Sequence, residues 1–324
     1  MLLGSSTLID GLPGLELTST NSVYPYLQVI SDGNTWRMLS RSTDGIITSS
    51  NVYLIVDVSG GPTASSYPVS YQATVPDLTG SGNLEFKTNK IVLKYILPGS
   101  FTMGNTTVGS IPEHPVVLTK GFWAGVFEVT RKQWLNVMAN NPDTPSYTNS
   151  SNTLPMEMVS WEDLRGATAN WPTSSTVESS TFLGILQAKT GLPFDLPTEA
   201  EWEYTCRAAT ITLWSFGSAT AGDYEWDDSN SGAPREVGAK LPNPWGLYDM
   251  HGNVWELCRD WYLSPYPTSS EQVDPSGSTS GSFRVFRGGR FNGSPNLSRS
   301  ANRAFQPPNF RNGYLGFRLF MRPK

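Results

Sequence analysis

The sequence predicts a loop-rich α+β protein in which a small β-rich module precedes a larger domain with few helices. The chain of 324 residues contains 30 Gly, 24 Pro and 11 Trp, which predicts much irregular structure fixed by aromatic side chains. Short β-prone runs separated by turn residues fill residues 1–92. Helix-start signals follow only after residue 129.

Residues 1–92 form the predicted N-terminal module. Its β-prone runs are Tyr26–Ile30, Val52–Val58, Val69–Val75 and Lys90–Ile96, the last of which crosses into the second domain. Turn clusters such as SDGN and SGGP lie between the runs, as expected of hairpins. The module shows no catalytic pattern, and a spacer, a particle-attachment domain and an assembly surface are all compatible with it.

Residues 93–324 contain three signals that predict helix starts. Each consists of a Ser or Thr with an acid or amide three residues later, and the two side chains cap the backbone reciprocally. The pairs are Thr130 with Gln133, Ser160 with Asp163, and Thr198 with Glu201. We expect Trp202, in the third helix, to face the core.

Composition and charge exclude several classes of protein. Net charge is −5 and no basic tract occurs, so we expect no nucleic-acid partner. No apolar run is long enough for a membrane-spanning segment. The start, MLLGSSTLIDGLPG, lacks a basic segment and a long apolar run, so we expect no signal peptide. A virion or cell-surface location reached by another route is compatible with this sequence.

The cysteines and histidines are few. Cys206 and Cys258 cannot form a disulfide framework in a chain of this length, and we expect two buried thiols. Neither has an evident histidine partner, because the only histidines are His114 and His251. Two separated histidines predict neither a histidine-rich metal site nor a Ser-His-Asp triad.

The C-terminal stretch from Phe283 to Arg318 alternates between two kinds of sequence. The blocks RVFRGG, SRSANR and GFR carry arginines that we expect to hold the backbone through forked hydrogen bonds: Arg287, Arg299, Arg303 and Arg318. Between them, Arg290–Asn296, Ala304–Phe310 and Asn312–Tyr314 mix aromatics with Asn, Ser, Gly and Pro. Such a mixture is typical of a binding surface, although an ordinary loop with buried aromatics gives the same composition.

A cluster of acids precedes that stretch, in NPWGLYDMHGNVWELCRDW. Asp249, Glu256 and Asp260 flank a Gly-Asn turn, and hard cations bind carboxylates together with the carbonyls that such turns expose. The same acids could instead cap turns or pair with the arginines of the C-terminal stretch.

Eight motifs together resemble the formylglycine-generating (sulfatase-modifying-factor) superfamily. In order they are ILPGSFTMG, FEVTRKQW, PMEMVSW, LPTEAEWEY, NPWGLYDMHGNVWEL, RVFRGG, RSANR and LGFRL, between Leu93 and Met321. The resemblance implies a variant of the C-type lectin fold. It also implies a structural calcium ion bound by the side chains of Asp249 and Glu256 and the carbonyls of Gly252 and Val254.

This sequence differs from the enzymes of the superfamily at the residues of their active site. Those enzymes oxidise a substrate cysteine with two copper-binding cysteines that follow the Gly-Gly motif. Here Gly293 and, approximately, Ser298 occupy these positions, and neither supplies a thiolate. We therefore expect no copper and no formylglycine synthesis. Relatives that use non-haem iron need a histidine cluster, which two separated histidines do not provide.

The sequence resembles a second subgroup of the superfamily, the variable proteins of diversity-generating retroelements, more than it resembles the enzymes. Their last segment is diversified at template adenines, which makes Asn, Ser, Gly, Phe, Tyr, Ala and Arg reachable. By this resemblance residues 284–318 are the variable region of a non-enzymatic protein that binds varied protein or other surface ligands. The candidate ligand-binding residues are Arg290, Phe291, Gly293, Ser294, Asn296, Ala304, Phe305, Asn309, Phe310, Asn312, Gly313 and Tyr314. An enzyme of the superfamily and an accessory structural domain are the alternatives.

Overall fold

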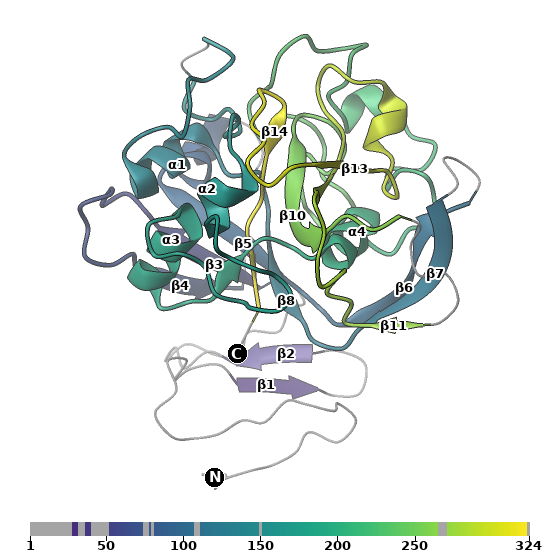
Figure 1. Cartoon of the computed structure of the whole chain (residues 1–324), viewed down its shortest axis with the longest axis horizontal. Helices are drawn as coiled ribbons and strands as arrows, with labels where there is room; N and C mark the ends of the chain where they lie inside the picture. Colours follow the sequence, from purple (N-terminus) through teal and green to yellow (C-terminus); the bar gives the residue numbers. More distant parts are fainter. Residues whose placement is uncertain are drawn as a thin grey trace, which may run out of the picture.

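The computed structural model describes residues 28–31, 36–39, 52–73, 78, 81–106, 111–148, 151–264 and 271–322, and it has the α+β class predicted from the sequence (Figure 1). The helices are α1 (Arg131–Met138), α2 (Trp161–Arg165), α3 (Phe182–Thr190) and α4 (Glu199–Arg207), with 3-10 turns η1 (Ser81–Lys87), η2 (Ala221–Asp223) and η3 (Pro295–Ser298). The strands are β1 (Gln28–Ser31), β2 (Trp36–Leu39), β3 (Tyr53–Asp57), β4 (Val69–Gln72), β5 (Lys90–Ile96), β6 (Gly99–Asn105), β7 (Ile111–Leu118), β8 (Phe122–Gly125), β9 (Phe194–Asp195), β10 (Trp255–Trp261), β11 (Gln272–Val273), β12 (Arg284–Arg287), β13 (Arg303–Gln306), β14 (Leu315–Gly316) and β15 (Phe320–Met321).

The largest sheet combines strands from both ends of the chain. Its order is β4-β3-β5-β8-β15-β9, with β3 antiparallel to β5 and β15 antiparallel to both β8 and β9. Strands β3 and β4 belong to the predicted N-terminal module, yet they extend the sheet of the larger domain. The predicted boundary at residue 92 therefore falls inside this sheet. Of the other expected strands, β1 covers part of Tyr26–Ile30, and β1 pairs with β2. Residues 1–27, 32–35 and 40–51 lie outside the described residues.

The two faces of this sheet are buried in two separate hydrophobic cores. Successive side chains of a strand point to opposite faces. Accordingly Leu54 and Leu93 join the core formed with α1, α2 and α3, whereas Ile55 and Val92 join the core formed with α4, β10 and β12. Figure 1 shows α1–α3 on one side of the molecule and α4 beside β10. Burial on both faces explains why these strands read as continuous apolar runs.

All three predicted helix starts are confirmed. Helices α1, α2 and α4 begin after Thr130, Ser160 and Thr198, and each cap forms the complete reciprocal capping box. Trp202 in α4 is fully buried, as expected. Every residue of α4 is buried, including Glu199, Glu201 and Glu203, which places three carboxylates inside the protein. These carboxylates need charged or hydrogen-bonding partners there.

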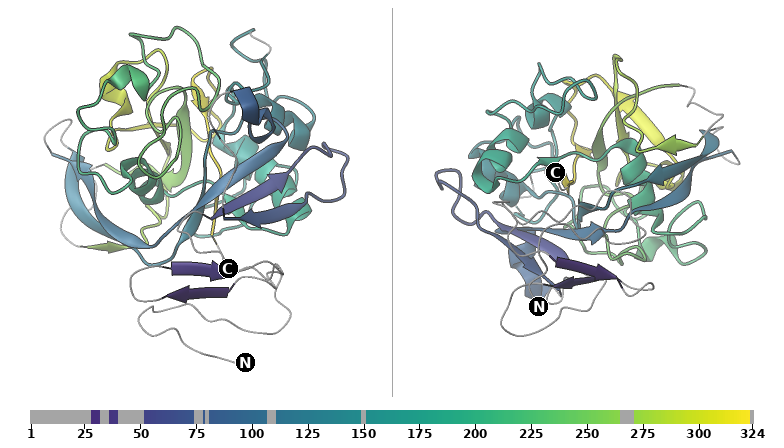
Figure 2. Two further views of the ribbon diagram at one scale, coloured as in Figure 1. Left: turned by 180° about the vertical axis from the view of Figure 1, so that it is seen from behind. Right: turned by 90° about the horizontal axis from the view of Figure 1, so that it is seen from below.

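A second sheet holds most of the C-terminal stretch. Its order is β13-β12-β10-β14, and three of its strands come from residues 284–318. Strands β12 and β13 pair antiparallel, while β14 runs parallel to β10. The long β6–β7 hairpin, joined by β11, curves along the flank opposite α1–α3 (Figure 2). The loops that connect these strands are thus anchored to a sheet whose inner strands, β10 and β12, are buried.

Candidate ligand-binding face

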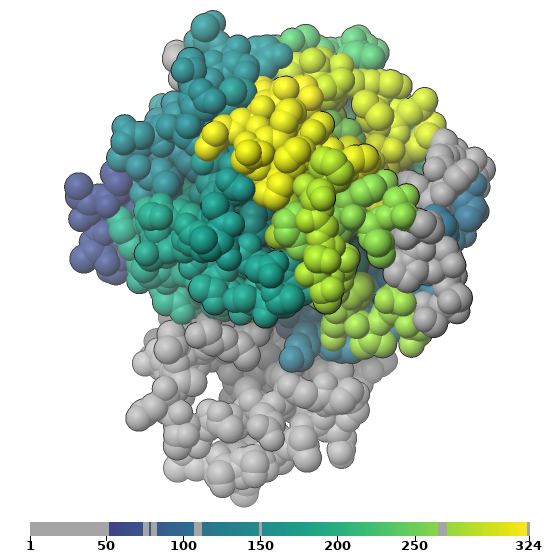
Figure 3. All heavy atoms as spheres, in the orientation of Figure 1, coloured from purple at the N-terminus to yellow at the C-terminus, as the bar shows by residue number. Residues whose placement is uncertain are grey.

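The C-terminal residues cover a continuous area of one side of the molecule, drawn in yellow in Figure 3. Exposure within the predicted set varies. Ser294, Asn296, Phe305 and Asn309 are exposed. The half-exposed residues are Arg290, Ala304, Phe310, Asn312 and Tyr314. Three of these, Ala304, Phe310 and Tyr314, pack against the α1–α3 core with part of their surface.

The expectation of exposure is wrong for Phe291, Gly293 and Gly313, which are buried. Phe291 is fully buried, and its backbone N–H donates to the carbonyl of Asn253 at 2.7 Å. A side chain at Gly313 would collide with Ser146, because an added Cβ would lie 2.4 Å from the Ser146 Cβ. These three residues therefore lie beneath the exposed residues of the face and pack against the scaffold.

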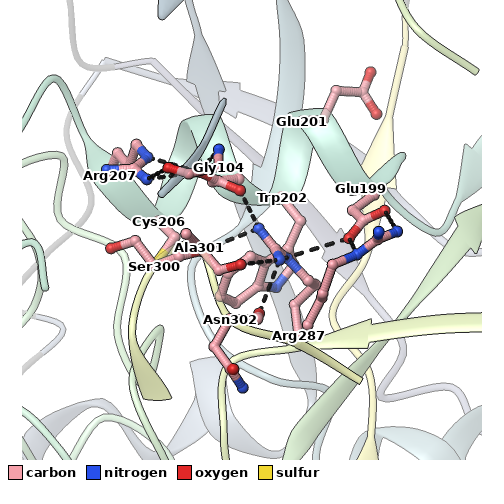
Figure 4. Close-up of polar contacts among 12 residues, drawn as sticks. Gly104, Glu199, Glu201, Trp202, Cys206, Arg207, Arg287, Ser300, Ala301 and Asn302 are labelled. Atoms are coloured by element: carbon pink, nitrogen blue, oxygen red, sulfur yellow. Dashed lines mark hydrogen bonds and ion pairs between the residues drawn. The ribbon is translucent and has the colours of Figure 1, made fainter. Parts of the chain in front are cut away.

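Arg287 holds the loop that follows η3, as Figure 4 shows. Its guanidinium is fully buried and donates to three successive backbone carbonyls in residues 300–302, at 3.0, 2.8 and 2.8 Å. The same two nitrogens also meet acids of α4: Nη2 pairs with Glu203, and Nη1 lies 3.5 Å from Glu199 Oε1. Arg207 in turn donates to Glu203 at 2.8 Å. Helix α4 thus anchors this loop through backbone contacts that do not depend on the side chains displayed.

The other three framework arginines differ in role. Arg318 is fully buried and donates to Glu256 at 2.7 and 2.6 Å, and Arg303 forks onto Glu199 at 2.8 and 2.7 Å. Both behave as expected. Arg299 does not, because it is half-exposed and donates to the exposed Asn296 side chain. Arg299 is therefore part of the face.

The Gly-Gly motif brings two turns together. Gly289 has a φ of +85°, and an added Cβ would lie 2.7 Å from the Ser298 Cα, so only glycine fits there. The Ser298 hydroxyl donates to the buried carboxylate of Glu225. Burial raises the pKa of Glu225 to about 7, and this hydrogen bond opposes the rise. Glu225, which lies in the loop between α4 and β10, thus supports η3.

A buried histidine lies beneath the same turn. His251 Nε2 accepts from the Ser215 N–H at 3.2 Å, so Nδ1 carries the proton and donates to the Ser298 carbonyl at 2.7 Å. Cys206 is buried as expected, but its Sγ lies 3.7 Å from His251 Nε2, which corrects the expectation of no histidine partner. Burial lowers the pKa of His251 to about 4 and raises that of Cys206 to about 12. Both groups are therefore neutral at pH 7, and this arrangement favours packing over nucleophilic chemistry.

The two carboxylates among the four residues expected to bind calcium have partners within the protein. Both carboxylate oxygens of Glu256 accept from Arg318, and one also accepts from Trp202 Nε1 at 2.7 Å. Asp249 accepts from the Gly238 N–H at 2.6 Å with one oxygen, and its other oxygen is buried without a hydrogen bond. The Gly252 N–H donates to the Gly288 carbonyl, which ties this turn to the Gly-Gly motif. Among the described residues, no group of three or more His, Cys, Asp or Glu side chains has the arrangement of a metal site.

Tyr147 borders the face, and the sequence analysis did not select it. It is half-exposed and meets the Phe291 ring edge-on, with centroids 5.3 Å apart. The Glu157 carboxylate accepts from the Ser146 N–H at 3.1 Å and from Arg131 at 2.7 Å, which fixes this turn. A lone aromatic in the polar loop 140–152 was the available signal, but its contact with a residue 144 positions away is not readable from the sequence.

The family model for the sulfatase-modifying factor enzyme 1-like domain matches residues 84–323. The chain belongs to this family. The formylglycine-generating enzyme of Streptomyces coelicolor is 36% identical over 143 residues, which cover 38% of this chain and 45% of that enzyme. The serine/threonine-protein kinase pkn1 of Chlamydia caviae is 29% identical over 230 residues, covering 69% of this chain and 37% of the kinase. The chain thus spans less than half of either relative.

Two solved structures match a larger share of this chain and of their own length. Treponema denticola variable protein 1 superimposes with a TM-score of 0.61 at 30% identity, covering 72% of this chain and 96% of that protein. PvdO from Pseudomonas aeruginosa superimposes with a TM-score of 0.57 at 22% identity, covering 72% and 94%, which shows a shared fold. The C-type lectin-like fold expected from the resemblance is therefore confirmed. None of the described helices is long and apolar enough to cross a membrane.

Proposed function

We propose that this chain is a non-catalytic display protein whose C-terminal face binds varied protein or other surface ligands and is diversified by a retroelement. The observation that carries the proposal is the division between the blocks and the runs of residues 284–318. Arg287 and Arg318 in the blocks are buried and bound to backbone carbonyls and acids, whereas Ser294, Asn296 and Asn309 in the runs are exposed. Such a face tolerates substitution because the fold does not depend on it.

Similarity to Treponema denticola variable protein 1 supports this proposal, because that protein matches over 96% of its length at 30% identity. Rigid aromatics and adaptable Asn and Ser side chains on one face are also the composition of a binding surface. Phe305 is 40% exposed and stacks on Tyr262 with centroids 4.0 Å apart, which offers an apolar contact point.

Catalysis is the competing proposal, because formylglycine-generating enzymes belong to the same family. The positions aligned with their cysteine pair are occupied by Gly293 and, approximately, Ser298. Both are buried, and the Ser298 hydroxyl is bonded to Glu225. These contacts favour a structural role for the turn. Incubation of the protein with copper and a sulfatase-type cysteine peptide should yield no aldehyde.

Sequencing of the DNA around the gene tests the display proposal directly. We expect a nearby reverse transcriptase gene and an imperfect copy of the segment that encodes residues 284–318, differing from it at template adenines. Substitutions between related strains should fall on the codons of the three runs and spare those of Arg287, Arg303 and Arg318. A segment without such a copy, with changes spread evenly over blocks and runs, would refute diversification.

A further inference from the structure

The C-terminal stretch is strongly basic in an otherwise acidic chain. Residues 283–318 contain seven arginines and no Asp, Glu or Lys, whereas net charge over the whole chain is −5. Four of the seven pair with acids of other segments: Arg287 with Glu203, Arg303 with Glu199, Arg311 with Asp163 and Arg318 with Glu256. Arg284 is buried between the indole rings of Trp161 and Trp261, at 3.8 and 3.2 Å from their centroids. The scaffold thus accounts for five of the seven.

Arg290 and Arg299 are the remaining two. Neither forms an ion pair within 4 Å of a carboxylate in the part of the chain that the structure describes, and both are half-exposed. Each lies over an aromatic ring: the Arg290 guanidinium carbon is 4.4 Å from the Tyr314 centroid, and that of Arg299 is 5.4 Å from the Trp214 centroid. A guanidinium that stacks on a ring keeps its N–H edge free for a partner in the ring plane.

Fixed contacts restrict the motion of both side chains. Asn296 accepts a hydrogen bond from Arg299, and the Trp214 N–H donates to the Pro295 carbonyl at 3.3 Å, which holds that ring against η3. Arg290 stacks on Tyr314, and its backbone carbonyl accepts from the Gly293 N–H at 3.1 Å. Less side-chain entropy is therefore lost when either arginine binds a partner.

We propose that Arg290 and Arg299 are the charged recognition points of this face and that the ligand of this variant is a protein segment that presents Asp or Glu side chains to them. The inference rests on the proposed display function and specifies its ligand class. Planar guanidinium groups match carboxylates in a two-point hydrogen-bonded fork. Two isolated cations on a chain of net charge −5 do not form the extended basic surface that binds nucleic acid.

The test uses a fluorescein-labelled, capped hexaglutamate peptide and fluorescence anisotropy in about 20 mM salt, where screening of exposed charges is weak. The variants R290Q and R299Q keep the polar character of each side chain and remove its charge. Lys120→Gln is the matched control, because Lys120 is exposed in the β7–β8 connection and its loss changes net charge equally. Thermal unfolding of every variant checks that the fold is intact.

We expect the wild-type protein to bind hexaglutamate, the single arginine variants to bind several-fold more weakly, and the double variant to lose at least about tenfold, as for charged pairs that are partly desolvated. K120Q should bind within about twofold of wild type, because Lys120 lies outside the C-terminal stretch and makes no close charge pair with the ligand. An equal loss in K120Q, or no wild-type binding at 1 mM protein as an approximate upper limit, would overturn the proposal.

Hexathymidylate, labelled in the same way, separates acidic protein segments from nucleic acid. Binding of hexathymidylate as tight as that of hexaglutamate, with the same loss in the double variant, would also overturn the assignment to a protein ligand. Failure of this experiment leaves the display proposal standing, because the latter depends on the template copy in the DNA and not on any one ligand.

Discussion

Arg287 and Glu203 form an ion pair in which neither side chain is exposed to solvent. Arg287 lies on β12, Glu203 lies on α4, and the same guanidinium binds the backbone of residues 300–302. A helix outside the C-terminal stretch therefore fixes the loop conformation of that stretch. This relationship explains how the face can vary in sequence and keep its shape.

Replacement of Arg287 by Ala should destabilise the protein by about 3–5 kcal/mol, because the buried Glu203 would keep only one of its two arginine partners. The three carbonyls of residues 300–302 would lose their donor at the same time. Urea unfolding followed by tryptophan fluorescence measures the change. A loss under about 1 kcal/mol would mean that the pair is no more than an exposed surface bridge.

Truncation of Phe291 should destabilise the protein strongly and truncation of Asn309 hardly at all, although both residues lie in the predicted runs. Phe291 is fully buried against Tyr147, so Phe291→Ala should cost about 3–5 kcal/mol. Asn309 is exposed, so Asn309→Ala should change stability by less than about 0.5 kcal/mol. Thermal and urea unfolding of the two variants provide the comparison. Equal effects would contradict the division between supporting and displayed residues.

Glu225 should make stability depend on pH. Burial raises its pKa from 4.5 to about 7, so the folded state holds this proton more tightly than the unfolded state does. The contribution of Glu225 is therefore most favourable below pH 4.5 and is lost as pH rises to about 7. In Glu225→Gln this loss is absent. The melting temperature of the variant relative to wild type should consequently rise between pH 5 and pH 8, and a constant difference would contradict the assignment.

Chelation should leave stability unchanged. A calcium ion at the expected residues would compete with Arg318, since both carboxylate oxygens of Glu256 accept from that guanidinium in a buried pair. We therefore expect the same melting temperature with and without excess EGTA, and no calcium by elemental analysis. A lower melting temperature in EGTA would show that a folded-state ion exists and that the Arg318 pair rearranges around it.

The parts of the fold that depend on neighbouring residues were predictable from the sequence, and the parts that depend on distant pairing were not. The capping boxes at Thr130, Ser160 and Thr198 involve residues three apart, and all three are present. The pairing of β3 with β5 across the expected boundary joins residues about 40 positions apart, and no local signal encodes it.

The same distinction applies to the candidate face. The alternation of blocks and runs identified exposed positions such as Asn296 and buried anchors such as Arg287. Burial of Phe291 depends on Tyr147, and the position of Cys206 depends on His251, which is 45 residues away. The pair of Glu256 with Arg318 joins residues 62 positions apart, and the sequence left open whether the acids near the Gly-Asn turn bind an ion or pair with these arginines.

A pair of matched libraries tests the central claim most directly. One library randomises displayed positions, namely Ser294, Asn296, Phe305 and Asn309, and the other randomises supporting positions, namely Arg287, Phe291, Ser298 and Arg318. Both are displayed on yeast, and the fraction of protease-resistant variants is measured by sequencing before and after digestion. The account predicts that most variants of the first library survive and that almost none of the second do. Similar survival of the two libraries would contradict it.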